Sequence, residues 1–260
     1  MPDDLDTRET NNYLSPLWSK LFSSRIYFGF LLILLFGIPR FYLVLQANIS
    51  GSYQAVSFIF MIMWLSPWLF LKKSGRKEIG LKKPKSWLWI LLAFPAGVLL
   101  CAQVLGVTDF FFPESPGNSF EYISRTYAAN MNNMEGVDPM MIFWITAGTS
   151  MIFSPIGEEF LYRGVIHHSF VPQYGHRKAS IIDSLAFALT HLAHFGIIYA
   201  AGGWSFVPLA AGLWVLLMFF VCQVFHWIKV KSGSVFGAVL CHAGFNFTMT
   251  YFIFFNYLIP

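Results

Sequence analysis

Long apolar runs limit most strongly how this chain can fold. A helix that crosses the hydrocarbon core of a bilayer needs about 20 mostly apolar residues. Charged residues make up only 12% of the chain, about half of the roughly 25% typical of soluble domains. The sequence therefore predicts an all-α fold, a polytopic integral membrane bundle of about seven transmembrane helices. The seven runs are Ile26–Gln46, Ser52–Leu71, Trp87–Val107, Pro139–Phe170, Ser180–Ala200, Phe206–Ile228 and Ser234–Ile259.

Other fold classes do not fit the composition. Hydrophobic residues make up 56% of the chain, which excludes a disordered protein. A membrane β-barrel would show short alternating segments instead of long unbroken apolar runs. The 3 cysteines are scattered without a Cys-x-x-Cys pair, so we expect neither a disulfide framework nor a thiolate metal site.

The distribution of basic residues predicts how the chain is oriented. The loop Lys72–Lys85 holds a cluster of the chain's lysines and arginines, and basic loops remain on the cytoplasmic side. With seven spans, the N-terminus is then cytoplasmic and the C-terminus external. This topology and contact with anionic lipid explain the basic loop, so we expect the lipid bilayer as a partner and no nucleic acid. The acidic start of the chain is unlike a signal peptide, so the first run is expected to remain as an anchor.

Three regions follow from this pattern. Residues 1–25 form an N-terminal cytoplasmic segment, residues 26–138 hold the first spans and an outer loop, and residues 139–260 form the functional core. The outer segment Thr108–Asp138 contains prolines and a glycine near its start. We expect it to cap the outer face, with a short interfacial helix over Glu121–Asn133.

The fourth run carries charges that are costly in a membrane. Glu158, Glu159 and Arg163 lie in its second half, and each buried charge costs roughly 2.5–3.5 kcal/mol on insertion scales. Glu159 and Arg163 are four residues apart, so they share a helix face and can form an ion pair. Glu158 points about 100° away around the helix and is expected to lack a cationic partner. An unpaired, partly desolvated carboxylate is a candidate general base or acid.

Two later runs supply more polar side chains. His191 lies one helical repeat after Phe187, and His242 and Asn246 lie four residues apart on one face. Buried polar side chains in lipid face the bundle interior, where they find partners. Counted from the cytoplasmic loops, Glu158, His191 and His242 reach similar depths. We therefore expect them to meet in the cytoplasmic half of the bundle.

The remaining polar residues of these runs have weaker patterns. We expect Asp183 to be an interfacial or capping residue and His194 to be a packing residue. The other histidines are expected to be interfacial or packing residues as well: His167, His168, His176 and His226.

The three motifs together resemble a known family. Glu158-Glu159-x-x-x-Arg163, Phe187-x-x-x-His191 and His242-x-x-x-Asn246 are similar to the motifs of the CAAX protease and bacteriocin-processing (Abi) family of glutamate intramembrane proteases. The resemblance covers about residues 140–247. It implies an intramembrane endopeptidase that hydrolyses membrane-associated proteins or peptides, and we expect a bacterial plasma membrane as its location.

The resemblance also implies roles for the motif residues. Glu158 would activate a water, which His191 would help to bind, and His242 and Asn246 would stabilise the oxyanion. Glu159 and Arg163 would be supporting residues. No cofactor is expected. Zinc is the nearest alternative, since Glu158, His191 and His242 are ligand types of a catalytic zinc site, but the sequence has no His-Glu-x-x-His motif.

Two other function classes remain open at this point. Buried carboxylates, histidines and arginines also form proton relays in ion-coupled transporters, although the sequence shows no doubled, inverted repeat. A non-catalytic membrane scaffold is the other alternative. The apolar surface of a membrane protein gives no indication of a prenyl-binding preference.

Overall fold

The chain folds into a bundle of helices, described by a computed structural model for residues 13–132, 134 and 136–259. Residues 1–12 of the expected N-terminal segment 1–25 lie outside the described residues. The long helices are α3 (Arg25–Ser50), α4 (Gln54–Phe70), α6 (Trp87–Phe111), α8 (Pro139–Glu158), α9 (His167–Thr190), α10 (Pro208–Ser232) and α11 (Val235–Ile253). The shorter helices are α2 (Pro16–Leu21), α5 (Lys73–Glu78) and α7 (Ser119–Asn132), with the turns η1 (Glu159–Ile166), η2 (His191–Ala193) and η3 (Phe254–Leu258).

The predicted fold class, an all-α polytopic membrane bundle, is confirmed, but the number of spans differs from seven. Five helical segments of the described chain are long and apolar enough to cross a membrane. One expected span, Gln54–Phe70, has only 17 residues. Two others, expected over Pro139–Phe170 and Ser180–Ala200, lie in one helical segment of 55 residues, Pro139–Ala193, which is interrupted by a kink at Gly175.

The fifth expected span also ends earlier than predicted. Its helix ends at Thr190, and a two-stranded antiparallel hairpin follows, formed by β1 (Ile197–Ala200) and β2 (Gly203–Phe206). Glycines at positive φ, Gly196 and Gly202, lie on either side of β1, a conformation that glycine adopts at no steric cost. The apolar composition of this stretch therefore reflects a short hairpin rather than the end of a helix.

A kink inside α9 brings distant polar residues together. Gly175 has φ 70° and ψ 167°, which are not helical values, and glycine tolerates this region because it has no Cβ. The chain folds back there, so that His167 in the first half of α9 contacts Asp183 in the second half.

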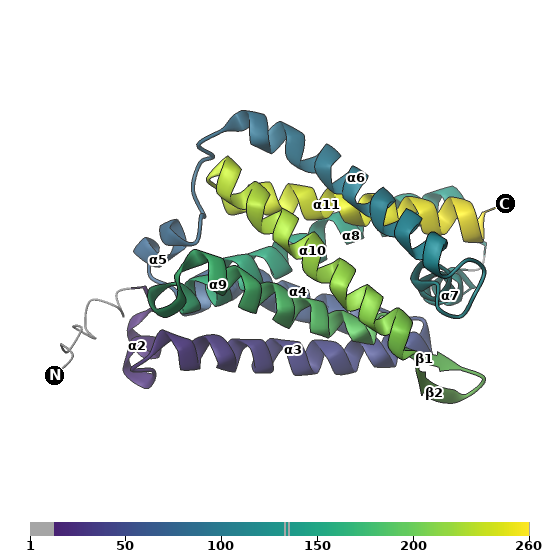
Figure 1. Cartoon of the computed structure of the whole chain (residues 1–260), viewed down its shortest axis with the longest axis horizontal. Helices are drawn as coiled ribbons and strands as arrows, with labels where there is room; N and C mark the ends of the chain where they lie inside the picture. The colour runs from purple at the N-terminus through teal and green to yellow at the C-terminus, as the bar shows by residue number, and fades with distance from the viewer. Residues whose placement is uncertain (1–12, 133, 135, 260) are drawn as a thin grey trace.

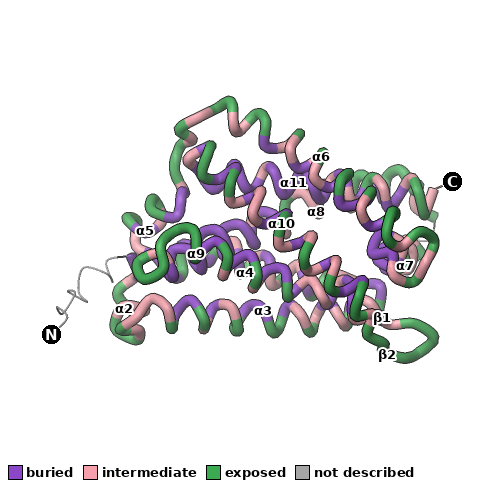
Figure 2. Tube along the Cα trace, viewed as in Figure 1, coloured by how far each residue is buried: buried purple, intermediate pink, exposed green. Residues whose placement is uncertain are grey.

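Different elements lie at the two ends of the bundle (Figure 1). Helices α2 and α5 and the kink of α9 lie at one end, and α7, the hairpin and the C-terminus lie at the other. Helices α3, α4 and α9 pack on one side, and α6 and α11 pack on the other. Apolar side chains on the outer helix faces are exposed, such as Leu91 at 73% and Leu209 at 82%, as expected for a surface that faces lipid (Figure 2).

Candidate active site

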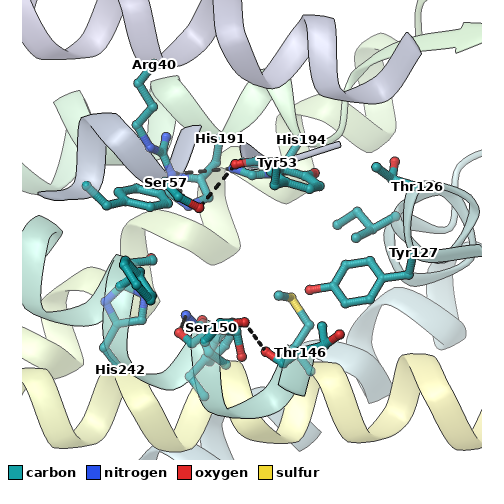
Figure 3. Close-up of a pocket in the computed structure, with 18 of the residues that line it drawn as sticks. Arg40, Tyr53, Ser57, Thr126, Tyr127, Thr146, Ser150, His191, His194 and His242 are labelled. Atoms are coloured by element: carbon teal, nitrogen blue, oxygen red, sulfur yellow. Dashed lines mark hydrogen bonds between the residues drawn. The ribbon is translucent and has the colours of Figure 1, made fainter. Parts of the chain in front are cut away.

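A cavity of about 280 Å³ lies inside the bundle between these two groups of helices. Its walls come from α3, α4, α7, α8, α9, α10 and α11, and they are mainly aromatic, aliphatic and neutral polar. Figure 3 shows Arg40 and His191 on one side of the cavity, His242 and Ser150 on the opposite side, and Tyr127 of α7 towards one end. Three predicted site residues line the cavity: His191, His242 and Asn246. His194, close to His191 in the sequence, lines it as well.

Glu158 has a cationic partner, which corrects the expectation that it is unpaired. Its Oε1 lies 2.6 Å from Nη2 of Arg40 in α3, and both side chains are 1% exposed. Its Oε2 accepts a hydrogen bond of 2.6 Å from the Ser154 hydroxyl. The expectation of an unpaired Glu158 is wrong because its partner comes from another helix, α3. The spacing of the motifs does not specify how α3 is rotated against α8.

Glu159 holds His242 in a fixed orientation. Its Oε1 lies 2.9 Å from His242 Nδ1, so the ring donates from Nδ1 to the carboxylate. His242 Nε2 then lies 3.7 Å from Glu158 Oε2. The two adjacent carboxylates thus differ in their closest contacts, Glu158 with Arg40 and Glu159 with His242.

The expected pair between Glu159 and Arg163 is present, with 3.3 Å between Glu159 Oε2 and Arg163 Nε. Both side chains are fully buried, and the Arg163 guanidinium lies 4.5 Å from the centre of the Phe187 ring. Residues Glu159–Ile166 form a π-helix rather than the expected α-helix. Such wide turns occur within α-helices, frequently at functional sites.

Arg40 also connects Glu158 to two histidines. His191 Nδ1 lies 2.9 Å from the carbonyl oxygen of Phe187, so Nδ1 carries the hydrogen and Nε2 accepts. Nη2 of Arg40 lies 3.4 Å from His191 Nε2 and 3.4 Å from His194 Nε2. His194 is therefore part of the polar wall of the cavity, where it also stacks on Tyr53, and not only a packing residue.

Asn246 lies on the opposite wall. Its amide nitrogen donates one hydrogen bond of 2.9 Å to the carbonyl oxygen of Ser150, and an amide nitrogen has two hydrogens to donate. Asn246 therefore has a second hydrogen that is not required by Ser150. His242 and Asn246 share a face of α11, as their spacing predicts, and both line the cavity.

Arg40 is the site residue that the sequence analysis missed. An arginine inside an otherwise apolar run is itself an indication of a functional position, since charges in a membrane are costly and are retained with partners. The sequence pattern of Ile26–Gln46 contains this indication. Its partner is not readable there, because Glu158 lies on a different helix.

Asp183 is not the interfacial or capping residue that was expected, and the remaining histidines differ from one another in their placement. Asp183 is fully buried, and its Oδ1 lies 3.9 Å from Arg163 Nε. His167 is also fully buried and contacts Asp183. His168 donates from Nδ1 to the carbonyl oxygen of Gly164, and His176 is exposed.

The three residues considered for a catalytic zinc ion do not enclose a favourable cation site. Arg40 Nη2 contacts both Glu158 Oε1 and His191 Nε2, so a guanidinium already occupies the space between two of the three ligands. Its positive charge opposes a divalent cation there.

Comparison with known proteins confirms the family resemblance. Residues 140–248 match the family model described as type II CAAX prenyl endopeptidase Rce1-like. No curated protein sequence gives a significant match, and no solved structure does. The matched segment contains all three motifs and implies a protease.

Proposed function

From the family match over residues 140–248 and the contacts of Glu158, we propose that the chain is an intramembrane endopeptidase that hydrolyses peptide bonds by glutamate-activated water. The observation that supports this most is that the two carboxylates have different closest partners. Glu158 contacts three residues that line the cavity, Arg40, Ser154 and His242, whereas Glu159 orients His242.

Glu158 is the general base in this proposal. Its carboxylate lies against the guanidinium of Arg40, and a carboxylate can accept a proton from water. Arg40 Nη2 lies between Glu158 Oε1 and His191 Nε2, so we place the attacking water at Glu158 Oε2, on the side of His242. His191 then acts mainly by holding Arg40 through the contact of 3.4 Å.

His242 and Asn246 are the groups that face the developing charge. Peptide hydrolysis passes through a tetrahedral oxyanion, which donors fixed in advance stabilise. Asn246 has a hydrogen to donate, and His242 donates from Nε2 once it has taken over the proton that Glu158 removed from the attacking water, a proton that it then gives to the leaving amine. Glu159 at 2.9 Å from Nδ1 keeps the ring in place for both states, as a buried carboxylate does for the histidine of a catalytic triad.

The cavity also suggests the kind of peptide that binds. Arg40 is its only formally charged lining residue among those described, and aromatic and methionine side chains form much of its wall. Burying an unpaired charge in such a cavity is costly. We propose that the substrate is an uncharged, apolar segment of a membrane-associated protein or peptide.

The test compares the termini of membrane proteins in cells that express active or inactive chain. Glu158→Gln preserves size and removes the base, so the new protein termini that appear with wild type should be absent. In a purified system with one of these substrates, the rate should fall by about 10²–10⁴ for Glu158→Gln and about 10²–10³ for Asn246→Ala.

Glu121→Gln is the matched control, because Glu121 lies in α7, where it forms an exposed ion pair with Arg125. This variant should cleave at the wild-type rate. If wild type generates no new termini, or if folded Glu158→Gln generates the same ones, the chain is not a glutamate protease. Proton flux by the purified chain in liposomes would then favour the transporter alternative.

A further inference from the structure

Arg163 lies close to two carboxylates, and only one of them belongs to the three motifs. Its Nε is 3.3 Å from Glu159 Oε2 and 3.9 Å from Asp183 Oδ1, and all three side chains are fully buried. Asp183 does not line the cavity. The guanidinium therefore has a second counter-ion to which the proposed hydrolysis gives no part.

Asp183 is held in place independently of Arg163. His167 Nδ1 donates a hydrogen bond of 2.7 Å to its Oδ2, and the Ser184 hydroxyl donates one of 3.4 Å to its Oδ1. His167 comes from the first half of α9 and Asp183 from the second half, so this support depends on the kink at Gly175. These contacts fix the carboxylate where its Oδ1 approaches Arg163.

The buried charges of this region balance only when Asp183 is counted. Glu159 and Asp183 are the two carboxylates, and Arg163 and Lys229 are the two cations. The Lys229 ammonium donates to the carbonyl oxygen of Arg163, and its charge acts on both carboxylates. Without Asp183, two buried cations would share the single carboxylate of Glu159, and an uncompensated buried charge is costly.

Glu159 has a second partner that needs the same carboxylate. Its Oε1 lies 2.9 Å from His242 Nδ1, while its Oε2 contacts Arg163. In the proposed hydrolysis His242 takes over a proton and becomes a cation. Negative charge nearby stabilises that cation, and a surplus of positive charge opposes it. The charge of Asp183 therefore bears on the reaction, although its side chain lies outside the cavity.

We propose that Asp183 is a positioning residue for the hydrolysis, which acts on His242 through Arg163 and Glu159. It balances the buried cations, so that Glu159 can orient His242 and stabilise it after the proton is taken over. This inference rests on the proposed function, since only the protease reaction gives His242 that proton to carry.

The experiment measures kcat and KM on the full chain, purified in detergent, with a substrate found by the comparison of termini. Asp183→Asn preserves size and removes the charge. A carboxylate behind a metal-binding histidine typically contributes about 10–100-fold, and we expect kcat to fall by that order. The KM should stay close to that of wild type, because Asp183 does not line the cavity.

A second variant separates the effect of charge from that of structure. Adding Arg163→Gln to Asp183→Asn removes one cation together with the carboxylate and releases Glu159 from its competing partner. The double variant should therefore have a higher kcat than Asp183→Asn alone. A residue that only stabilises the fold predicts the opposite, because the second substitution then removes a further buried contact.

Asp138→Asn is the matched control. Asp138 is exposed and caps the N-terminus of α8, and asparagine caps helices about as well as aspartate, so this variant should retain the kcat and KM of wild type. Melting temperatures report whether each variant is folded.

Folded Asp183→Asn with the kcat of wild type, or a double variant no more active than Asp183→Asn, would overturn the proposal. If Asp183→Asn does not fold, the charge-balanced double variant decides, and an activity as low as that of Glu158→Gln counts against Asp183. Failure of the proposed function is a separate result, in which wild type does not cleave or Glu158→Gln still does.

Discussion

Arg40 and Glu158 form an ion pair that is almost completely shielded from solvent. Placing two charges in a low-dielectric interior is costly, and removing one of them leaves the other without compensation. Arg40 also donates a hydrogen bond of 2.7 Å to the Thr190 hydroxyl. At the scale of single residues, this arginine links α3 to α8 and α9.

We predict that Arg40→Met lowers the free energy of unfolding by about 3–5 kcal/mol, because Glu158 is left charged and buried. Methionine retains much of the apolar stem of arginine, so the loss reports mainly on charge. Adding Glu158→Gln should recover part of the stability, as measured by equilibrium unfolding in detergent.

Arg125→Met tests the same change in an exposed pair. Arg125 contacts Glu121 with side chains that are 53% and 36% exposed, and exposed pairs contribute roughly 0–1 kcal/mol. The double variant Arg40→Met, Glu158→Gln would contradict the buried pair if it lost as much free energy of unfolding as the two single variants lose in total.

At the scale of elements, the close packing of α6 on α11 positions two site residues. A Cβ on Gly97 of α6 would overlap the carbonyl oxygen of Cys241, and one on Gly244 of α11 would overlap that of Phe94. Small residues allow backbones of membrane helices to approach in this way. Helix α11 carries His242 and Asn246, so this contact supports one wall of the cavity.

Gly97→Ala should therefore destabilise the protein by about 1–3 kcal/mol, as overpacking does, and should lower activity because α11 moves. Gly106→Ala is the matched control on the same helix, since no atom lies within 4 Å of a Cβ there. It should be neutral, or stabilising by about 0.5–1 kcal/mol through helix propensity. Equal thermal stability of the two variants would show that the close contact is absent.

The distribution of charge over the whole molecule predicts its orientation in the membrane. The basic loop Lys72–Lys85 and the hairpin lie at opposite ends of the bundle (Figure 1). The positive-inside rule places the loop in the cytoplasm and therefore the hairpin outside. The cavity includes residues of α7, which lies at the hairpin end.

Cysteine labelling of intact cells can check this orientation, because all three native cysteines are buried. A membrane-impermeant thiol reagent should label Ser205→Cys in the exposed β2 and should not label Lys77→Cys in the exposed α5. Permeabilised cells, in which both variants should react, provide the control. Labelling of Lys77→Cys alone in intact cells would reverse the topology.

The sequence by itself determined the features that depend on local spacing. Apolar runs of membrane length predict the helices, and intervals of four residues place Glu159 with Arg163 and His242 with Asn246. The tertiary structure decided which side chains pair between helices: Glu158 with Arg40, and Glu159 with His242. It also decided the early end of α9 at Thr190 and the meeting of His167 with Asp183 across the kink at Gly175. Periodicity fixes the face of a residue on its own helix, but the rotation and depth of one helix against another are set by packing, and packing alone brings distant residues into contact.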